Sequence, residues 1–377
     1  MIYFSVFFLL ILLRLACSGK RKLLLEISPL VYFLLFLFVA FRYEVGCDWP
    51  TYREWYANFG IVGLGMELTF MNPTYWGIMK AMKSLDFSFP WLNVIYASIF
   101  FTTSWIFIRR QPDPLAVIIL MFPLLIMNMP MSALRQAAAI GIIMVAYLAF
   151  IDKKLTKYIV LTILATLFHS SALIFVVLIP FVKGEVDYKK LITGGLLALP
   201  GIIALALSDL GQLAALRYVD TGYEAYGAVY RVGLLAISSL IFLLFFRKQW
   251  LKKYPKEYSL MMVGSSMMLV CFLSLSVSTI IGDRFAYYLI PLQAAFFARI
   301  PYMEIKNWKS FWVATPYAMN LALFSVWILL SGFFKLAIYH TTHGYWANLI
   351  PGEIIMNSGK VIMEESTTSE KKSIIYC

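Results

Sequence analysis

The chain has 377 residues, of which 61% are hydrophobic and 14% charged, and its mean hydropathy is +0.79. No soluble domain of this size needs so much apolar surface, so the composition indicates an integral membrane protein. The apolar runs are continuous and close to the length of a spanning helix, unlike the alternating strands of an outer-membrane barrel. We therefore expect an all-α, polytopic bundle of membrane-spanning helices.

The order of the apolar runs predicts about 11–12 spans, with one ambiguous segment at 156–182. A single helix there would move the basic cluster between Arg247 and Lys256 to the outside. Two short helices, 156–167 and 171–182, keep that cluster in the cytoplasm, as the positive-inside rule favours. With the N-terminus outside, this topology puts the surplus charge of +12 on the cytoplasmic side, so no nucleic-acid partner is needed to explain it. The other predicted spans are 1–17, 23–41, 91–108, 115–130, 133–151, 190–207, 231–246, 258–280, 285–302 and 311–333.

These spans form one predicted transmembrane domain, residues 1–357, with outer loops at 42–90, 208–230 and 334–357. Asn72-Pro73 in the first loop favours the start of a short amphipathic or re-entrant helix over 71–84. The polar composition of residues 358–377 predicts a disordered tail.

Charged residues at the mouths of spans are candidates for a functional site, because a charge near hydrocarbon costs roughly 2.5–3.5 kcal/mol. Arg135 lies in the first turn of a predicted helix, where the helix dipole disfavours a cation, so an anion is expected beside it. Small residues at 137–139 and 141 leave room for another helix or a lipid tail. Arg42 and Asp48 follow a span directly. An interfacial anchor explains Arg42 equally well, but does not explain Asp48.

Two further motifs are predicted on the same side of the membrane. Asp283-Arg284 joins two predicted spans by a very short outer turn, so Arg284 would enter a helix at its positive end with Asp283 orienting it. A local ion pair between the two is the alternative. His169 lies at the predicted helix break, where it is either structural, a general base, or a donor to a phosphate.

The loop around residues 217–231 is rich in tyrosine, with acids beside the aromatic rings. Such a combination suits sugar recognition, by stacking on apolar ring faces and by hydrogen bonds to hydroxyls. An aromatic belt at the membrane interface explains the same pattern equally well. The candidate substrate-binding residues here are Arg217, Tyr223, Glu224, Tyr226 and Arg231.

Several motifs are missing from the sequence. It has no P-loop, GxGxxG, GxSxG or HExxH motif and no DxD-type carboxylate pair. We therefore expect no cofactor, no bound metal and no cytoplasmic nucleotide donor. A substrate would arrive already activated, from the membrane itself.

The candidate residues, in their order and shared sidedness, resemble the EpsG family of bacterial polysaccharide polymerases, which belongs with the Wzy-type O-antigen polymerases. The resemblance extends from about residue 40 to 300. It is carried by Arg42-Tyr43…Gly46…Asp48…Tyr52, Arg135-Gln136…Ala138, Phe168-His169-Ser170-Ser171-Ala172 and Asp283-Arg284…Tyr287.

The resemblance implies polymerisation of lipid-linked repeat units on the outer face of the bacterial cytoplasmic membrane, in a fold related to class C membrane glycosyltransferases. A growing glycan on undecaprenyl diphosphate would pass to the terminal sugar hydroxyl of another lipid-linked unit. The implied partners are the undecaprenyl-diphosphate-linked oligosaccharide, membrane lipid and a chain-length regulator protein. On this hypothesis Arg42, Arg135 and Arg284 bind diphosphate, Tyr223, Glu224 and Tyr226 bind glycan, and Asp48 and His169 are the candidate bases.

Three other functions are compatible with parts of this pattern. An O-antigen ligase is chemically close and would share the arginines and the histidine. A transporter or flippase for lipid-linked sugars would need charged residues in the middle of its spans, which are scarce here. A membrane acyltransferase that modifies glycans would need only a single histidine.

Overall fold

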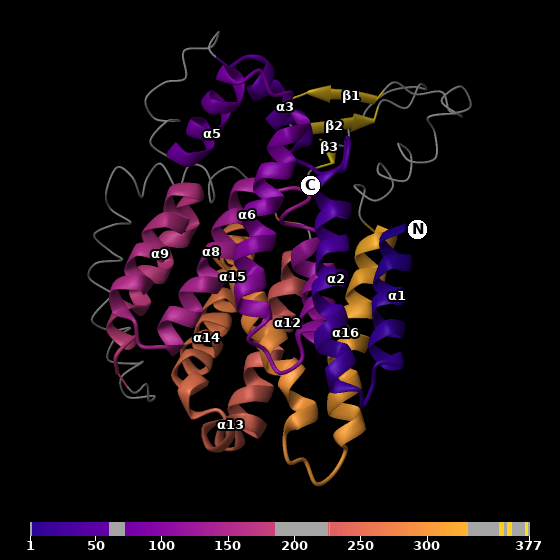
Figure 1. Cartoon of the computed structure of the whole chain (residues 1–377), viewed down its shortest axis with the longest axis vertical. Coiled ribbons are helices and arrows are strands. Elements are labelled where there is room, and N and C mark those ends of the chain that lie inside the picture. The colour runs from indigo at the N-terminus through magenta and orange to yellow at the C-terminus, as the bar shows by residue number, and fades with distance from the viewer. Residues whose placement is uncertain are drawn as a thin grey trace.

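The computed structural model describes residues 2–59, 72–184, 225 and 227–330, together with three short strands near the C-terminus. Apart from those strands, the described secondary structure is helical (Figure 1). Most helices run along the long axis of the molecule, and α3 (Trp49–Ala57) and α5 (Pro73–Ser84) lie at one end. The predicted all-α membrane bundle is therefore confirmed.

The helices lie where the apolar runs predict spans. Within the described residues, five helical segments are long and apolar enough to cross a membrane. They are α2 (Arg21–Ala40), α6 (Pro90–Ile108), α8 (Leu134–Ile151), α14 (Pro255–Ser274) and the continuous run of α12 (Ala228–Ile241), the π-helix η3 (Phe242–Phe246) and α13 (Arg247–Lys253). The remaining helices are α1 (Ile2–Ala16), α7 (Pro114–Met121), the π-helix η1 (Phe122–Ile126), α9 (Leu155–Phe168), η2 (Ser170–Phe181), α15 (Thr279–Arg299), η4 (Ile300–Tyr302) and α16 (Lys309–Leu330). The predicted span 190–207 lies outside the described residues.

The three strands are short and antiparallel. β1 (Ile354–Asn357) pairs with β2 (Lys360–Met363), and β2 pairs with β3 (Ile374–Ile375). Two of them fall in the segment 358–377, for which disorder is predicted. The rest of that segment and most of the predicted loop 334–357 lie outside the described residues.

The ambiguous segment is a helical hairpin. α9 ends at Phe168, and the backbone of His169 is extended before the 3₁₀-helix η2 begins. α9 and η2 lie side by side in opposite directions. The Tyr158 hydroxyl near the start of α9 donates to the Phe175 carbonyl of η2 at 2.7 Å. The predicted split into two short helices is confirmed. It puts His169 at the tip of the hairpin, where α5 also contacts α9 through Thr74.

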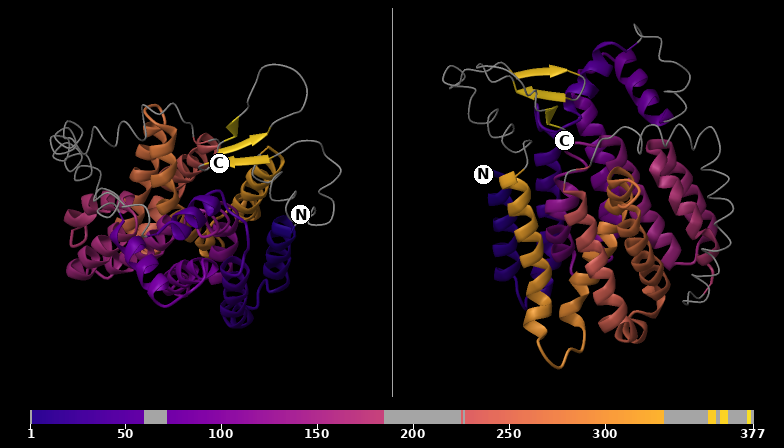
Figure 2. Two further views of the ribbon diagram at one scale, coloured as in Figure 1. Left: turned by 90° about the horizontal axis from the view of Figure 1, so that it is seen from above. Right: turned by 180° about the vertical axis from the view of Figure 1, so that it is seen from behind.

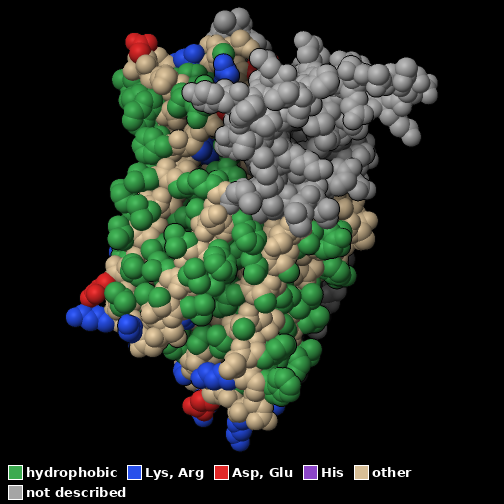
Figure 3. All heavy atoms as spheres, turned by 90° about the vertical axis from the view of Figure 1, so that its right-hand side faces the viewer, with side chains coloured by type: hydrophobic (Ala, Val, Ile, Leu, Met, Phe, Trp, Pro, Cys, Tyr) green, Lys and Arg blue, Asp and Glu red, His purple; other side chains and the backbone are tan. Residues whose placement is uncertain are grey.

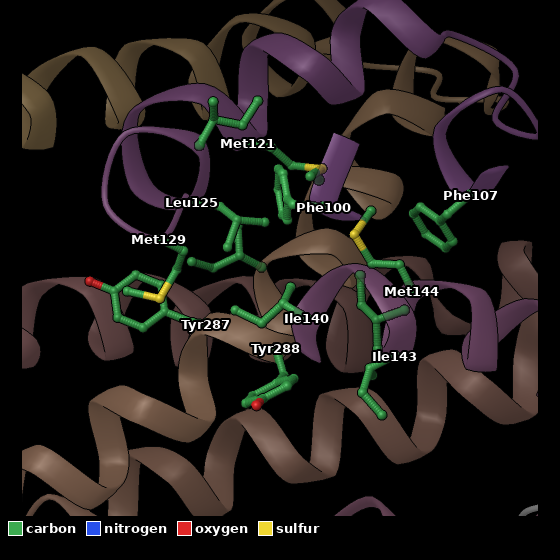
Figure 4. Close-up of a cluster of buried hydrophobic side chains, with 14 of the residues drawn as sticks. Phe100, Phe107, Met121, Leu125, Met129, Ile140, Ile143, Met144, Tyr287 and Tyr288 are labelled. Carbon is green, nitrogen blue, oxygen red and sulfur yellow. The ribbon is translucent and has the colours of Figure 1, made fainter. Parts of the chain in front are cut away.

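Helix α8 occupies the centre of the bundle, and nearly all of its side chains are buried. Among the small residues after Arg135, Gly141 packs closely against α6: a Cβ added there would lie 2.3 Å from the Thr103 hydroxyl and 3.2 Å from the Phe100 backbone. At Gly141 the neighbouring helix therefore takes the space that the sequence predicts for a helix or a lipid tail. Figure 4 shows the core that results, where side chains of α6, α8 and α15 such as Phe100, Ile140 and Tyr288 meet.

The two ends of the bundle differ in character. Figure 2 shows α3 and α5 at one end and α13 at the other. In Figure 3, hydrophobic side chains cover the middle of the molecule and Lys and Arg side chains gather toward the α13 end. Partly buried ion pairs join the helices at that basic end: Arg14 with Asp113 at 2.6 Å and Arg299 with Glu257 at 2.7 Å. The opposite end is the one that holds the candidate site.

Candidate functional site

The four predicted catalytic residues lie close together at the α3–α5 end, although they come from four separate elements. Asp48 precedes α3, Arg135 is in the first turn of α8, His169 is the hairpin tip and Arg284 is in α15. The Asp48 carboxyl lies within electrostatic range of both guanidinium groups, and so does the His169 imidazole. The fold therefore gathers two cations, a carboxyl and an imidazole in one place.

The loop that carries Asp48 is held against the segment before α8 by its backbone. Gly46 has φ +117°, and a Cβ there would lie 2.0 Å from the Met131 carbonyl oxygen, so only glycine allows this approach. The neighbouring Cys47 N–H donates to the Ser132 hydroxyl at 2.9 Å. These contacts place Asp48 beside the first turn of α8.

Arg42 has a different environment from the one predicted. Its side chain is buried, and its Nε and Nη1 donate to the carbonyls of Val39, Val45 and Met131 at 2.9–3.2 Å. Two of its five N–H groups thus bond to three carbonyls, and these bonds hold the loop that carries Asp48. These backbone contacts are not part of the sequence prediction, and the diphosphate-binding role that the sequence predicts for Arg42 stays a prediction.

Helix α15 begins earlier than predicted, because Ser278 caps it. The Ser278 hydroxyl accepts the N–H of Ile281 at 3.4 Å, so α15 starts at Thr279 and not after Arg284. The predicted short outer turn at Asp283-Arg284 is therefore wrong: both residues lie in the second turn of the helix. Arg284 is held by another contact, since the Gln136 side chain donates to its backbone carbonyl at 2.6 Å. This bond joins α8 to α15 directly next to Arg135.

Asp283 pairs with an arginine from another helix. Arg231 of α12 donates from Nε and Nη2 to the two carboxylate oxygens of Asp283, at 2.9 and 2.8 Å. Both side chains are nearly buried, with 12% and 11% exposed. Asp283 thus pairs with Arg231, in place of the contact with Arg284 that the sequence predicts. The substrate-binding role of Arg231 stays a prediction. The ion pair joins α12 to α15, and we call it the brace.

The Arg135 guanidinium lies against a group of aromatic rings from α3 and α5. Its central carbon is 5.9, 5.4 and 5.2 Å from the ring centroids of Tyr52, Trp55 and Tyr75. Cations are attracted to such ring faces, so the aromatic group holds the arginine without neutralising it. The positive charge of Arg135 therefore remains available to an anion.

Hydrogen bonds fix which nitrogen of His169 carries a proton. The Ser171 backbone N–H donates to Nδ1 at 3.3 Å, so Nδ1 is an acceptor. The Ser171 hydroxyl lies 2.6 Å from the same nitrogen and 2.9 Å from the Tyr288 hydroxyl. Tyr288 then donates to Ser171, and Ser171 to Nδ1. The neutral ring has its proton on Nε2, which makes that nitrogen a donor.

Burial and charge set the protonation of the site. Burial raises the pKa of Asp48, against the lowering effect of Arg135 and Arg284. Burial and the same two arginines hold the pKa of His169 well below its usual value. His169 is therefore neutral at pH 7. Even with Asp48 ionised, one carboxylate faces two guanidinium groups, so these four side chains carry a net charge of +1 and favour an anion.

Four predicted substrate-binding residues, Arg217, Tyr223, Glu224 and Tyr226, lie outside the described residues, so their roles stay predictions. Among the residues that are described, no three His, Cys, Asp or Glu side chains are grouped to hold a metal ion.

The sequence analysis did not predict α3, nor the contacts around the four central residues of the site, Asp48, Arg135, His169 and Arg284. Pro50, early in α3, is the signal that points to a helix start after Asp48. Ser171 lies two residues after His169 and contacts its Nδ1, whereas Gln136 follows Arg135 but donates to the backbone carbonyl of Arg284. The contact of Gln136 has no signal in the sequence, and that of Ser171 has only its adjacency to His169.

Comparison with known proteins gives one match. Residues 26–340 match the model of the EpsG family. The matched range contains all four central residues. No curated protein and no solved structure matches the chain.

Proposed function

The chain belongs to the EpsG family, a family of Wzy-type polymerases, and we propose that it is a polysaccharide polymerase acting on lipid-linked repeat units. It would transfer a growing glycan from undecaprenyl diphosphate to the terminal sugar hydroxyl of another lipid-linked unit. The observation that carries this proposal is the meeting of Arg135, Arg284, Asp48 and His169 at one end of the bundle.

In the proposed reaction, the oxygen of the acceptor hydroxyl attacks the anomeric carbon of the donor glycan. The bond from that carbon to the diphosphate oxygen breaks, and the diphosphate leaves with the bonding electron pair. Arg135 and Arg284 neutralise the charge that grows on it. Preorganised cations are usually the largest contribution to such a step.

The proton of the acceptor hydroxyl goes to Asp48 in this scheme and then to solvent. The sequence left Asp48 and His169 as alternative bases. The hydrogen bonds described above favour Asp48, because the lone pair of Nδ1 in His169 is already occupied and Nε2 carries a proton. The raised pKa of Asp48 also makes it a stronger base than an ordinary aspartate. His169 Nε2–H is then a neutral donor to a phosphate or sugar oxygen.

We further propose that the site faces the exterior of the bacterial cytoplasmic membrane. The gathering of Lys and Arg side chains at the α13 end supports this orientation, under the positive-inside rule. Exposed positions at the two ends allow a test: Asp86→Cys should react with a membrane-impermeant thiol reagent in intact cells, and Lys248→Cys should react only after lysis. The reverse pattern would remove the proposed site from the outer face.

The activity itself is tested in a strain that lacks the gene. Arg135→Ala and Arg284→Ala should abolish long glycan chains while the protein stays in the membrane. Arg53→Ala is the matched control: Arg53 is an exposed arginine of α3 that lies 3.7 Å from Glu44, and its loss should leave chain length unchanged. Full-length polymer from either site variant would contradict the assignment.

Purified protein supplied with lipid-linked repeat units then tests whether the chain polymerises them without any other protein. We expect chain growth without a nucleotide sugar, with or without a chelator. A chain-length regulator should narrow the length distribution without being needed for bond formation. An O-antigen ligase would need a different acceptor, which this assay does not contain, and so would build no ladder.

A further inference from the structure

A group of buried polar side chains adjoins the site without a hydrogen-bond partner. The Tyr75 and Tyr96 hydroxyls and both polar atoms of the Asn93 amide have none among the residues that the structure describes. The three side chains are fully shielded, with 0%, 1% and 1% exposed. Buried polar groups are nearly always bonded in folded proteins, so each such group calls for an explanation.

These three residues lie together and next to Arg135. The rings of Tyr75 and Tyr96 are 6.2 Å apart, and Tyr75 also packs on Tyr52 at 5.6 Å. Asn93 is three residues before Tyr96 on α6, and hence on the same face of that helix. The Arg135 guanidinium is 5.2 Å from the Tyr75 ring, and its own Nε likewise has no partner among the described residues. We call Tyr75, Asn93 and Tyr96 the unpartnered cluster.

The cluster also borders Asp48 and the hairpin tip that carries His169. Tyr96 packs edge-on against Phe168, the residue before His169, with ring centroids 6.2 Å apart. Tyr75 lies within electrostatic range of Asp48. A molecule bonded to the cluster would therefore present its atoms to the proposed base.

We propose that the unpartnered cluster is the subsite for the acceptor sugar, binding the hydroxyl groups next to the one that reacts. The chemistry of the orphaned atoms supports a sugar. The Asn93 carbonyl oxygen only accepts, so its ligand must donate, which excludes a diphosphate because that group has acceptors alone. A lipid tail has no polar atoms at all. Sugar hydroxyls both donate and accept, so they can bond the two tyrosine hydroxyls and both atoms of the Asn93 amide.

This proposal rests on the proposed polymerase function, and binding measurements can separate the two. The probes are the lipid-free repeat-unit oligosaccharide and undecaprenyl diphosphate without glycan, each titrated into the purified full-length protein. We expect Tyr75→Phe and Tyr96→Phe each to weaken oligosaccharide binding about five- to tenfold, as for the loss of one or two hydrogen bonds. Neither should change the affinity for undecaprenyl diphosphate. Arg284→Ala should do the opposite.

Thermal unfolding distinguishes a binding role from a structural one. Removing a hydroxyl that has no partner should leave the midpoint unchanged or raise it, since an unsatisfied buried group destabilises the fold. Tyr158→Phe is the matched control, because its equally buried hydroxyl donates to the Phe175 carbonyl. That variant should lower the midpoint and leave both affinities unchanged.

Three results would overturn the subsite. They are oligosaccharide affinity unchanged in both phenylalanine variants, a midpoint lowered as in Tyr158→Phe, or an unsubstituted protein that does not bind the oligosaccharide. Binding of undecaprenyl diphosphate retained by Arg284→Ala would instead count against the proposed function, and would leave the result on the cluster standing.

Discussion

Removing either partner of the brace between Arg231 and Asp283 should destabilise the protein strongly. The pair makes two charge-assisted hydrogen bonds at 2.8 and 2.9 Å and is only 11–12% exposed. Loss of one partner leaves the other charge buried and unpaired, which costs about 3–5 kcal/mol. Arg231→Ala and Asp283→Ala should therefore each lower the free energy of unfolding by that amount.

The double variant provides the control for this reasoning. With both charges removed, no unpaired charge remains, so the cost should be close to that of one single variant and not to the sum of about 6–10 kcal/mol. Unfolding by SDS titration in mixed micelles, followed by tryptophan fluorescence, measures all three. Single costs that add to within about 0.5 kcal/mol would refute a coupled pair.

The same variants separate a brace from a ligand. If the pair only holds α15 in place, Asp283→Ala should shorten the glycan chains, and the double variant should recover part of their length. If Arg231 binds substrate, as the sequence predicts, every variant lacking Arg231 should lose polymer completely. Glycan ladders from a strain without the native gene distinguish the two outcomes.

Three further predictions concern the protonation of the site and its supporting loop. Asp48→Asn should slow polymerisation at least about 100-fold; in the native protein the rate should fall as pH drops through the raised pKa of Asp48, and an unchanged pH profile in the variant would oppose its role as base. His169 has a lowered pKa in the folded protein. Below about pH 6.5 the unfolded chain therefore takes up a proton that the folded one does not, and the free energy of unfolding decreases as the pH decreases. His169→Gln should flatten that acid loss in unfolding titrations, and an unaltered slope would contradict it. Arg42→Lys should lower stability, through its lost carbonyl bonds, without changing the affinity for undecaprenyl diphosphate.

The features that follow from local patterns could be predicted from the sequence. Apolar run length gives the spans, and the hairpin break at His169 follows from the distribution of basic residues together with the polar His169-Ser170-Ser171 step. The helix after Asn72-Pro73 follows from proline at a helix start. The shared end of Asp48, Arg135, His169 and Arg284 follows from topology alone, because each lies at the same side of its span.

Features that depend on packing could not be predicted in this way. Asp283 has a neighbouring cation in sequence but pairs with Arg231, 52 residues away, because α15 starts at Thr279 and turns the carboxylate toward α12. The capping serine, Ser278, sits at the edge of a long apolar run and is easily read as part of a span. Arg42 has the sequence environment of a substrate ligand, yet its donors meet backbone carbonyls that only the folded loop brings near.

The 3₁₀ winding of η2 affects how the hairpin fits its surroundings. Its 12 residues rise about 2.0 Å each and so extend roughly 24 Å, whereas the 14 residues of α9 rise about 1.5 Å each and extend roughly 21 Å. The slimmer coil thus gives the shorter segment a reach comparable to its partner. An ordinary α-helix of 12 residues would stop near 18 Å. The 3₁₀ winding therefore lets 12 residues run back along α9 over its full length, while His169 stays at the hairpin tip at the site end of the bundle.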